Sequence, residues 1–189
     1  MKEAILNREI VVSKTACRLA GIAVFVVLTA LGAFVRVPLP FTPVPITLQT
    51  FFVLLSGAML GPVGGSFSQL SYFILGLAGI PLFTLSGSGI SYLAGPTTGY
   101  ILGFIIVGFL IGKSIRTSHK SLFSIMCIFI LGDLIILFCG ALWLKIIFNL
   151  TLNKALFLGV FPFVTGDIIK AVAASIIYAG FQARLKKIF

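Results

Sequence analysis

Long apolar segments, separated by short turns, constrain the fold of this chain more than any other feature. A helix needs about 20 residues to cross the hydrocarbon core of a bilayer, and fewer where the segment ends below the surface. By this rule we predict six membrane-spanning helices, at about 14–34, 47–60, 64–80, 97–113, 121–147 and 162–184. Glycine and proline mark the breaks between them. The 189 residues then form a single all-α membrane domain.

The composition supports a membrane protein. Hydrophobic residues make up 59% of the chain, charged residues 10%, and the mean hydropathy is +1.20, which is far from the values of soluble domains. Fourteen lysines and arginines face four acids. In a soluble chain this excess would suggest nucleic acid, but here the bases gather at the ends of the apolar segments. We therefore interpret the positive charge as a signal of membrane topology.

The distribution of the bases predicts the orientation. With six crossings, ten of them fall on one side: Lys2, Arg8, Lys14, Arg18, Lys113, Arg116, Lys120, Arg184, Lys186 and Lys187. The other side has three, Arg36, Lys145 and Lys154, and the fourteenth base, Lys170, lies inside a helix. The positive-inside rule then places both termini in the cytoplasm of a cell whose cytoplasmic (inner) membrane the chain spans several times. The loops before the second and fourth helices are extracytoplasmic.

The first of these loops is rich in proline. Residues 38–50 read PLPFTPVPITLQT, with four prolines in eight positions, a pattern that predicts neither helix nor ladder strand. The helix that follows has about 14 residues and is about 21 Å long, less than the roughly 30 Å of the hydrocarbon core. Thr47 and Gln49 should therefore lie below the outer surface. We expect the run to form a stiff wall or lid over a cavity.

The sharpest polar signal is TGDIIKA at 165–171, where Asp167 and Lys170 are three residues apart and share a helix face. Counting back from Arg184 places them in the outer third of the membrane. An ionisable pair at that depth indicates a functional site, although an ion pair that serves helix packing is the alternative. Asp133 is a lone acid in the fifth helix and lies nearer its cytoplasmic end than its outer end. We consider two roles for it: a structural role, with a hydrogen bond to a neighbouring residue, and a role in a proton relay.

A third polar element is the outer loop and helix start SGSGISYLAGPTTGYILG at 86–103. Gly87 and Gly89 allow close backbone approach or positive φ, and Tyr92 and Tyr100 offer flat amphipathic rings. Hydroxyl groups come from Ser86, Ser88 and Ser91. A solvent-facing linker is the alternative interpretation. Together with the proline run and the charged pair, however, the loop predicts a binding site on the extracytoplasmic side.

Enzyme motifs are absent from the sequence. GFLIGKS at 108–114 imitates a phosphate-binding loop, but Val107 occupies the position of its first glycine. The single histidine, His119, lies in a basic turn, and we expect no metal, cofactor or catalytic residue. If the chain drives transport with ATP, hydrolysis must occur in another subunit. Ala16 and Ala20, four residues apart, would let a second helix approach closely, although such patterns also arise by chance.

Three blocks resemble the BioY family, the biotin-specific S components of energy-coupling factor (ECF) vitamin transporters. They are PLPFTPVPITLQTFFVLLSGAMLGPVGG, GSGISYLAGPTTGYILGF and GDIIKA, and the resemblance covers most of residues 20–180. It implies six transmembrane helices and high-affinity binding of biotin from outside. It also implies three partner subunits, which are a transmembrane coupling protein and two cytoplasmic ATPases. In this family an Ala-x-x-x-Ala surface docks the coupling protein, and Ala16 and Ala20 match it.

The resemblance assigns the vitamin to Asp167 and Lys170. A ureido ring has two N–H donors and one carbonyl acceptor, which suit an aspartate, a lysine and, as a third anchor, Gln49. Further site residues that we predict are Phe41, Val44 and Tyr100 as apolar walls, with Thr47, Gly87, Ser88, Gly89 and Tyr92 beside them. We expect the ureido end to point inward, because Asp167 would repel a carboxylate. The alternative has Lys170 on the valerate carboxylate.

Two other classes of function remain open at this stage. A proton- or ion-coupled carrier of a small solute could use Asp133 and Asp167 as titrating sites. Such carriers often contain inverted repeats, and we find no convincing internal symmetry here. The third class is a structural subunit without a ligand. It would give no common reason for the proline run, the charged pair and the outer loop with Gly87 and Gly89, which we call the glycine loop.

Overall fold

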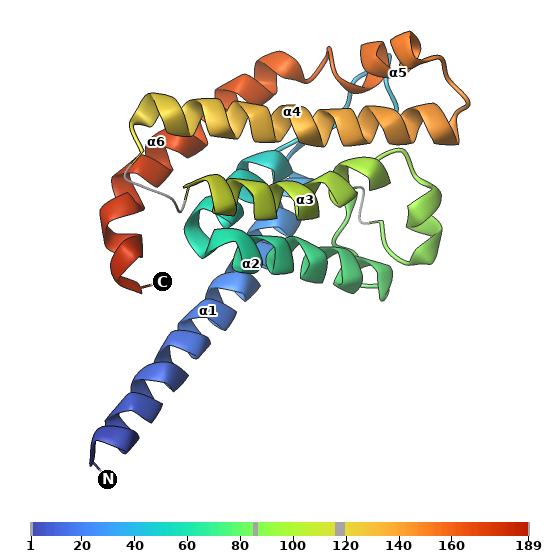
Figure 1. Cartoon of the computed structure of the whole chain (residues 1–189). Helices are drawn as coiled ribbons and strands as arrows, with labels where there is room; N and C mark the ends of the chain where they lie inside the picture. Colours follow the sequence, from blue (N-terminus) through green and yellow to red (C-terminus); the bar gives the residue numbers. More distant parts are fainter. Residues whose placement is uncertain (1, 85–86, 116–119, 189) are drawn as a thin grey trace.

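Helices build the framework of the chain (Figure 1), in a computed structural model that describes residues 2–84, 87–115 and 120–188. Side chains are described for residues 15–84, 87–115 and 120–182. The elements are α1 Lys2–Phe34, β1 Arg36–Val37, β2 Ile46–Thr47, α2 Gln49–Leu77, η2 Ile90–Ala94, α3 Thr98–Ile115, α4 Leu122–Ile147, α5 Leu152–Gly159 and α6 Val164–Ile188. The predicted all-α class is confirmed. Ser86, Arg116 and His119 lie outside the described residues.

The helix α2 contains a reversal of direction at Gly61, where φ is 76° and ψ is −177°. Glycine adopts a positive φ without steric cost, and Pro62 brings no N–H that would need an acceptor at the start of the next half. The Gln69 Nε2 donates to Ser56 Oγ at 3.1 Å, which holds the two halves side by side. The two predicted helices at 47–60 and 64–80 thus correspond to one helical hairpin. Counting α2 once, the described residues contain five helices long and apolar enough to cross a membrane.

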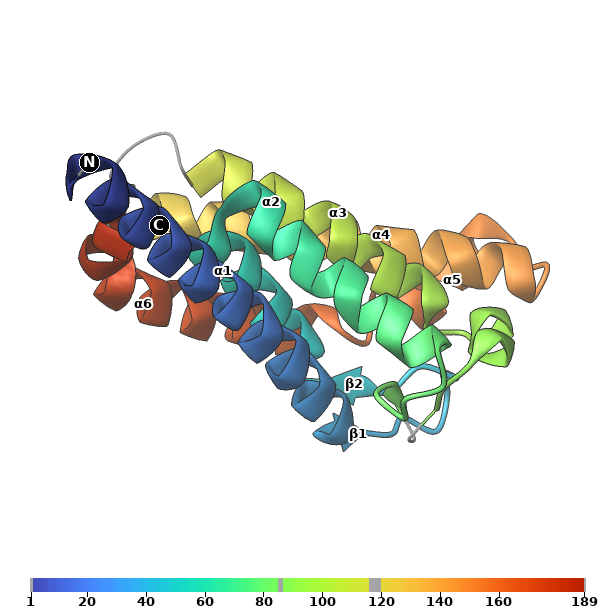
Figure 2. The same cartoon turned by 90° about the horizontal axis from the view of Figure 1, so that it is seen from below.

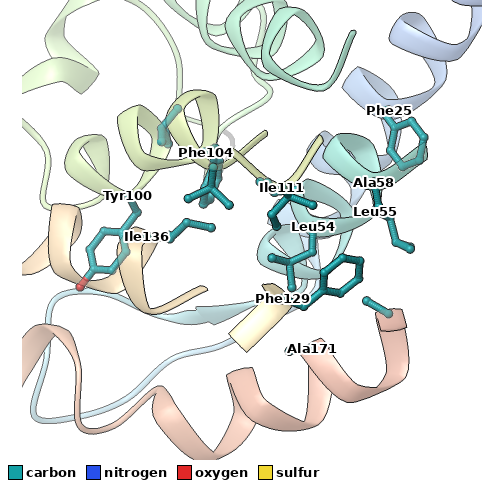
Figure 3. Packing of buried hydrophobic residues seen from close by; sticks show 14 of the residues in the cluster. Phe25, Leu54, Leu55, Ala58, Tyr100, Phe104, Ile111, Phe129, Ile136 and Ala171 are labelled. Atoms are coloured by element: carbon teal, nitrogen blue, oxygen red, sulfur yellow. The ribbon is translucent and has the colours of Figure 1, made fainter. Parts of the chain in front are cut away.

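Glycines let α2 and α3 approach at backbone distance. A Cβ added to Gly57 would lie 2.7 Å from the Gly108 carbonyl oxygen of α3, and one added to Gly65 would lie 2.9 Å from the same oxygen. Between apolar helices in lipid, such close van der Waals packing replaces the hydrophobic effect as the source of association. Larger buried side chains, among them Leu54 and Phe129, fill the space between the hairpin and its neighbouring helices (Figure 3).

The elements at the two ends of the bundle differ (Figure 2). One end holds the beginnings of α1 and α4 and the ends of α3 and α6. The other end holds the small sheet, η2 and α5. The part of α1 before the bundle projects away from the other helices (Figure 1). The polar residues of the predicted site lie toward this second end, which holds the small sheet, η2 and α5.

Two local features differ from the sequence prediction. Ile46 pairs with Val37 and Thr47 with Arg36 in an antiparallel ladder, so the expectation that residues 38–50 hold no ladder strand is wrong at this point. The pairing is possible because the prolines end at Pro45 and leave the next two N–H groups free to bond. The short helix α5 lies between the predicted helices at 121–147 and 162–184, where the sequence analysis predicts no helix. Its start is capped by the Thr151 hydroxyl, which accepts from the Lys154 N–H at 3.4 Å.

Candidate binding site

A small cavity lies where β2 and the start of α2 meet the first turns of α3 and α6. Its free volume is about 40 Å³, which is room for water-sized molecules. Most of its lining is apolar or neutral, with a single acid and a single base among the described residues that form it. These residues are Val44, Pro45, Thr47, Gln49, Thr50, Thr84, Thr97, Tyr100, Ile101, Phe104, Leu137, Phe163, Asp167 and Lys170.

Asp167 and Lys170 form a buried ion pair in the first turns of α6. The side chain of Asp167 is 4% exposed and that of Lys170 is 12% exposed. The Lys170 Nζ also donates to the Thr47 carbonyl oxygen at 2.9 Å and to Thr50 Oγ1 at 2.8 Å. An ammonium has three protons, so these contacts use all of them. Lys170 therefore ties α6 to β2 and to the start of α2, and it neutralises one buried carboxylate.

A chain of hydrogen bonds fixes Gln49 beside this pair. Thr47 Oγ1 donates to Gln49 Oε1 at 3.2 Å, and Gln49 Nε2 donates to Tyr72 Oη at 2.8 Å. The Tyr72 hydroxyl in turn donates to the Leu82 carbonyl oxygen at 3.1 Å. Tyr72 is fully buried and sits in the second half of the α2 hairpin. Because these hydrogen bonds connect β2 to the outer loop, they fix the positions of the polar residues on this side of the cavity.

Aromatic rings lie behind the polar wall. Tyr92 stacks on Phe83 with ring centroids 4.4 Å apart, and Phe83 meets Tyr72 edge to face at 5.5 Å. The Tyr92 hydroxyl accepts a hydrogen bond from Thr97 Oγ1 at 2.7 Å. Burial raises the pKa of the Tyr92 hydroxyl above its ordinary value, so this group is neutral at physiological pH. Gly87 packs directly against the Tyr92 ring, in space that a side chain would fill.

The helix α5 supports the opposite side of the cavity. The Tyr100 hydroxyl donates to the Gly159 carbonyl oxygen at 2.7 Å. Thr42, in the proline run, donates to the Leu158 carbonyl oxygen at 2.9 Å. The end of α5 thereby orients the Tyr100 ring and anchors the proline run above it.

The cavity includes only part of the predicted residue set. Six predicted residues line it: Thr47, Val44, Gln49, Tyr100, Asp167 and Lys170. Five others lie outside its lining: Phe41, Gly87, Ser88, Gly89 and Tyr92. Phe41 is 56% exposed at the surface, whereas the glycine loop turns at Gly89, with φ 81°, and packs behind the wall. Its backbone conformation explains the glycine, since most other residues would be strained there.

Several lining residues were not predicted. Thr50 gives Lys170 its second acceptor, and Leu137, Phe104 and Phe163 supply apolar surface. Phe163 lies four residues before Asp167, and a search for aromatic residues next to the charged pair would have found it. Leu137 lies within a continuous apolar helix, and its sequence neighbourhood carries no signal.

Buried polar groups in an apolar cavity, at one end of a bundle of membrane-length helices, define an integral membrane protein with a site for a small solute. The model of the BioY family matches residues 5–187, and the chain belongs to that family. It is 45% identical over 156 residues to the "Probable biotin transporter BioY" of Pyrococcus horikoshii, covering 82% of this chain and 90% of that one. It is 36% identical over 165 residues to the "Biotin transporter BioY" of Thermotoga maritima, covering 87% and 93%.

A solved structure has the same fold. The crystal structure of the S-component for biotin from an ECF-type ABC transporter matches with a TM-score of 0.82 at 30% sequence identity. The match covers 89% of this chain and 92% of the other. The resemblance noted from three sequence blocks is therefore confirmed as family membership.

Proposed function

We propose that this chain binds biotin and acts as the substrate-binding subunit of an ECF importer. The observation that supports this most directly is the polar set of the cavity. Asp167 is an acceptor for ring N–H groups, and Gln49 has a second amide proton for a ring carbonyl. Lys170 becomes a donor to the ligand by exchanging its bond to Thr47 or Thr50 when the walls separate. The aromatic and aliphatic walls suit a fused sulfur ring and an aliphatic tail. The relatives named as biotin transporters and the biotin S-component of the same fold support the same ligand.

Biotin would enter under the proline run. The cavity beside Asp167 and Lys170, called the central cavity from here on, has a free volume of about 40 Å³. A ligand of this size fills a few hundred Å³, so the walls of the cavity must separate on binding. An outer cavity of about 300 Å³ shares Pro45 with it and lies within the proline run itself, against Arg36 and Thr42. We expect the ureido ring to sit at Asp167 and the tail to extend past Pro45. The Arg36 guanidinium then offers a charge for the carboxylate.

The coupling protein would dock on the first half of the membrane span of α1. Ala16 and Ala20 are exposed there. The N-terminal part of α1 projects from the bundle (Figure 1). The same end of the bundle holds the four segment ends where the sequence places ten of its fourteen bases. This clustering supports a cytoplasmic location for both termini. ATP hydrolysis would then occur in ATPase subunits on that side.

Uptake of labelled biotin in cells that contain the chain and its ECF partners tests this function. ATP depletion with the proton gradient maintained should abolish uptake, because the energy comes from the ATPase subunits. Addition of a protonophore with ATP maintained should leave most of the biotin uptake intact. The reverse pattern would replace the importer with the proton- or ion-coupled carrier that the sequence left open.

Tyr72→Phe tests the hydrogen-bond chain behind Gln49. The change removes the acceptor of the Gln49 Nε2 without changing the size of the ring, so the amide loses its fixed orientation. We expect biotin affinity to fall by about 1 kcal/mol, the usual contribution of a neutral hydrogen bond, as measured by calorimetry. Tyr178→Phe, at a buried tyrosine of α6 outside the cavity lining, is the matched control. Equal affinity for Tyr72→Phe and the control would show that Gln49 needs no such support.

A further inference from the structure

The five membrane-length apolar segments of the described residues contain two acids, and Asp133 is the one to which the binding scheme assigns no role. It lies near the middle of α4, is 4% exposed, and its Oδ1 has no hydrogen-bond partner among the described residues. A buried carboxyl group in an apolar helix is costly, and an unpaired one more so. Such a group calls for an explanation beyond helix packing.

The location of Asp133 connects it to the binding cavity. A second cavity of about 170 Å³ lies between α4 and α6, lined by Asp133 and Asp167 among apolar side chains. Asp167 and Leu137 line both this cavity and the central one, so they form the wall between them. Asp133 and Asp167 thus come from different helices and line the same buried space.

The charges of this cluster do not balance if every group is ionised. Of the described residues that line the two cavities, Asp133 and Asp167 are the acids and Lys170 is the one base. Two carboxylates and one ammonium would leave a net negative charge buried in the membrane. Two adjacent carboxyl groups avoid this by binding one proton between them. The proton also turns one of the two acceptors into a donor, which allows a hydrogen bond between them.

We propose that Asp133 is protonated and donates a hydrogen bond to the Asp167 carboxylate, and that it thereby positions Asp167 for the ligand. Lys170 contacts Asp167 from the side of the central cavity, and Asp133 contacts it from the side of the second cavity. Asp167 then stays ionised and receives hydrogen bonds from two sides. Its remaining lone pairs accept from the ring N–H groups. This role rests on the proposed binding of biotin. Asp133 is a positioning residue and touches no ligand itself.

Two substitutions separate this role from simple packing. Asp133→Asn keeps a neutral side chain of the same size with an N–H donor, and we expect its biotin affinity to stay within about threefold of the wild type. Asp133→Leu keeps the volume and removes the donor. We expect it to bind biotin about tenfold more weakly or worse, because Asp167 loses a charge-assisted hydrogen bond. If Asp133 were instead ionised and repelled Asp167, Asp133→Leu would bind as well as the wild type or better, which would overturn the proposal.

Infrared spectroscopy of the purified protein without biotin provides an independent readout. A protonated carboxyl group has a C=O stretching band that carboxylates and amides lack. We expect this band in the wild type, shifted in deuterium oxide, and absent from Asp133→Asn. Its absence from the wild type, or its persistence in folded Asp133→Asn, would contradict a proton on Asp133. This result is independent of ligand identity, so a wild type that bound no biotin would refute the proposed function and leave the infrared comparison decisive for the proton.

Discussion

Lys170→Ala is expected to weaken biotin binding by about 1.5 to 3 kcal/mol, or roughly ten- to 150-fold, the range for a hydrogen bond to a charged group. Lys170 supplies the one positive charge of the central cavity lining among the described residues. Its loss also frees the link between α6 and the start of α2 that runs through Thr47 and Thr50. Calorimetric titration of the purified variant with biotin measures the effect.

The matched control for this prediction is Lys154→Ala. Lys154 is exposed on α5 and lies outside the cavity lining, so its removal changes the net charge equally without touching the site. Both variants should elute as single species with the helical content of the wild type. Wild-type affinity in folded Lys170→Ala would remove this lysine from the site and favour the interpretation of the charged pair as a packing element.

Ala16→Trp is expected to abolish ATP-dependent biotin uptake while leaving biotin binding by the isolated chain within about twofold of the wild type. The substitution adds an indole ring where we propose that the coupling protein approaches, and small residues are what permit close helix contact in lipid. The candidate cavity is lined by residues of β2 and the start of α2. The small sheet lies at the opposite end of the bundle from the start of α1 (Figure 2), so the cavity should not be affected by the change. Uptake in cells and calorimetry on purified protein measure the two halves of this prediction.

Leu131→Trp serves as its control, because Leu131 is 61% exposed on α4 and the variant presents the same ring to lipid on a different helix. Its uptake should match that of the wild type. If Ala16→Trp transports normally, the docking surface lies elsewhere on the chain. If Ala16→Trp loses binding as well as uptake, the substitution has disturbed the fold, and a smaller one such as Ala16→Val is needed to test the surface.

The sequence predicts the parts of this site that depend on depth and local chemistry. Asp167 and Lys170 are recognisable because charges are costly in a membrane helix, and their spacing places them on one face. The turn at Gly61 and Pro62 is recognisable from its residue types alone. The depth of Thr47 and Gln49 follows from the shortness of the predicted helix that they begin. Each of these inferences uses neighbours in the chain or distance along a single helix.

The remaining parts depend on contacts between distant segments. Tyr72 lies 23 residues from Gln49, and their hydrogen bond exists because the α2 hairpin sets them opposite each other. Nothing near Tyr72 in the chain indicates a polar role. Asp133 and Asp167 belong to different helices, and their proximity depends on how α4 and α6 pack. The glycine loop lies outside the cavity lining, and Gly87 packs against the Tyr92 ring, so its part in binding stays a prediction. The composition of a loop does not indicate whether it lines a cavity or packs behind the residues that do.

Titration of the purified, folded chain with biotin, beside thiamine and riboflavin, tests the central claim most directly. Calorimetry gives affinity and stoichiometry, and fluorescence of the single tryptophan, Trp143, gives a second signal, since its Nε1 donates to Gly95 in the outer loop. The account predicts tight one-to-one binding of biotin without any partner subunit, and no binding of the other two vitamins. Folded protein that binds no biotin, or binds all three alike, would contradict it.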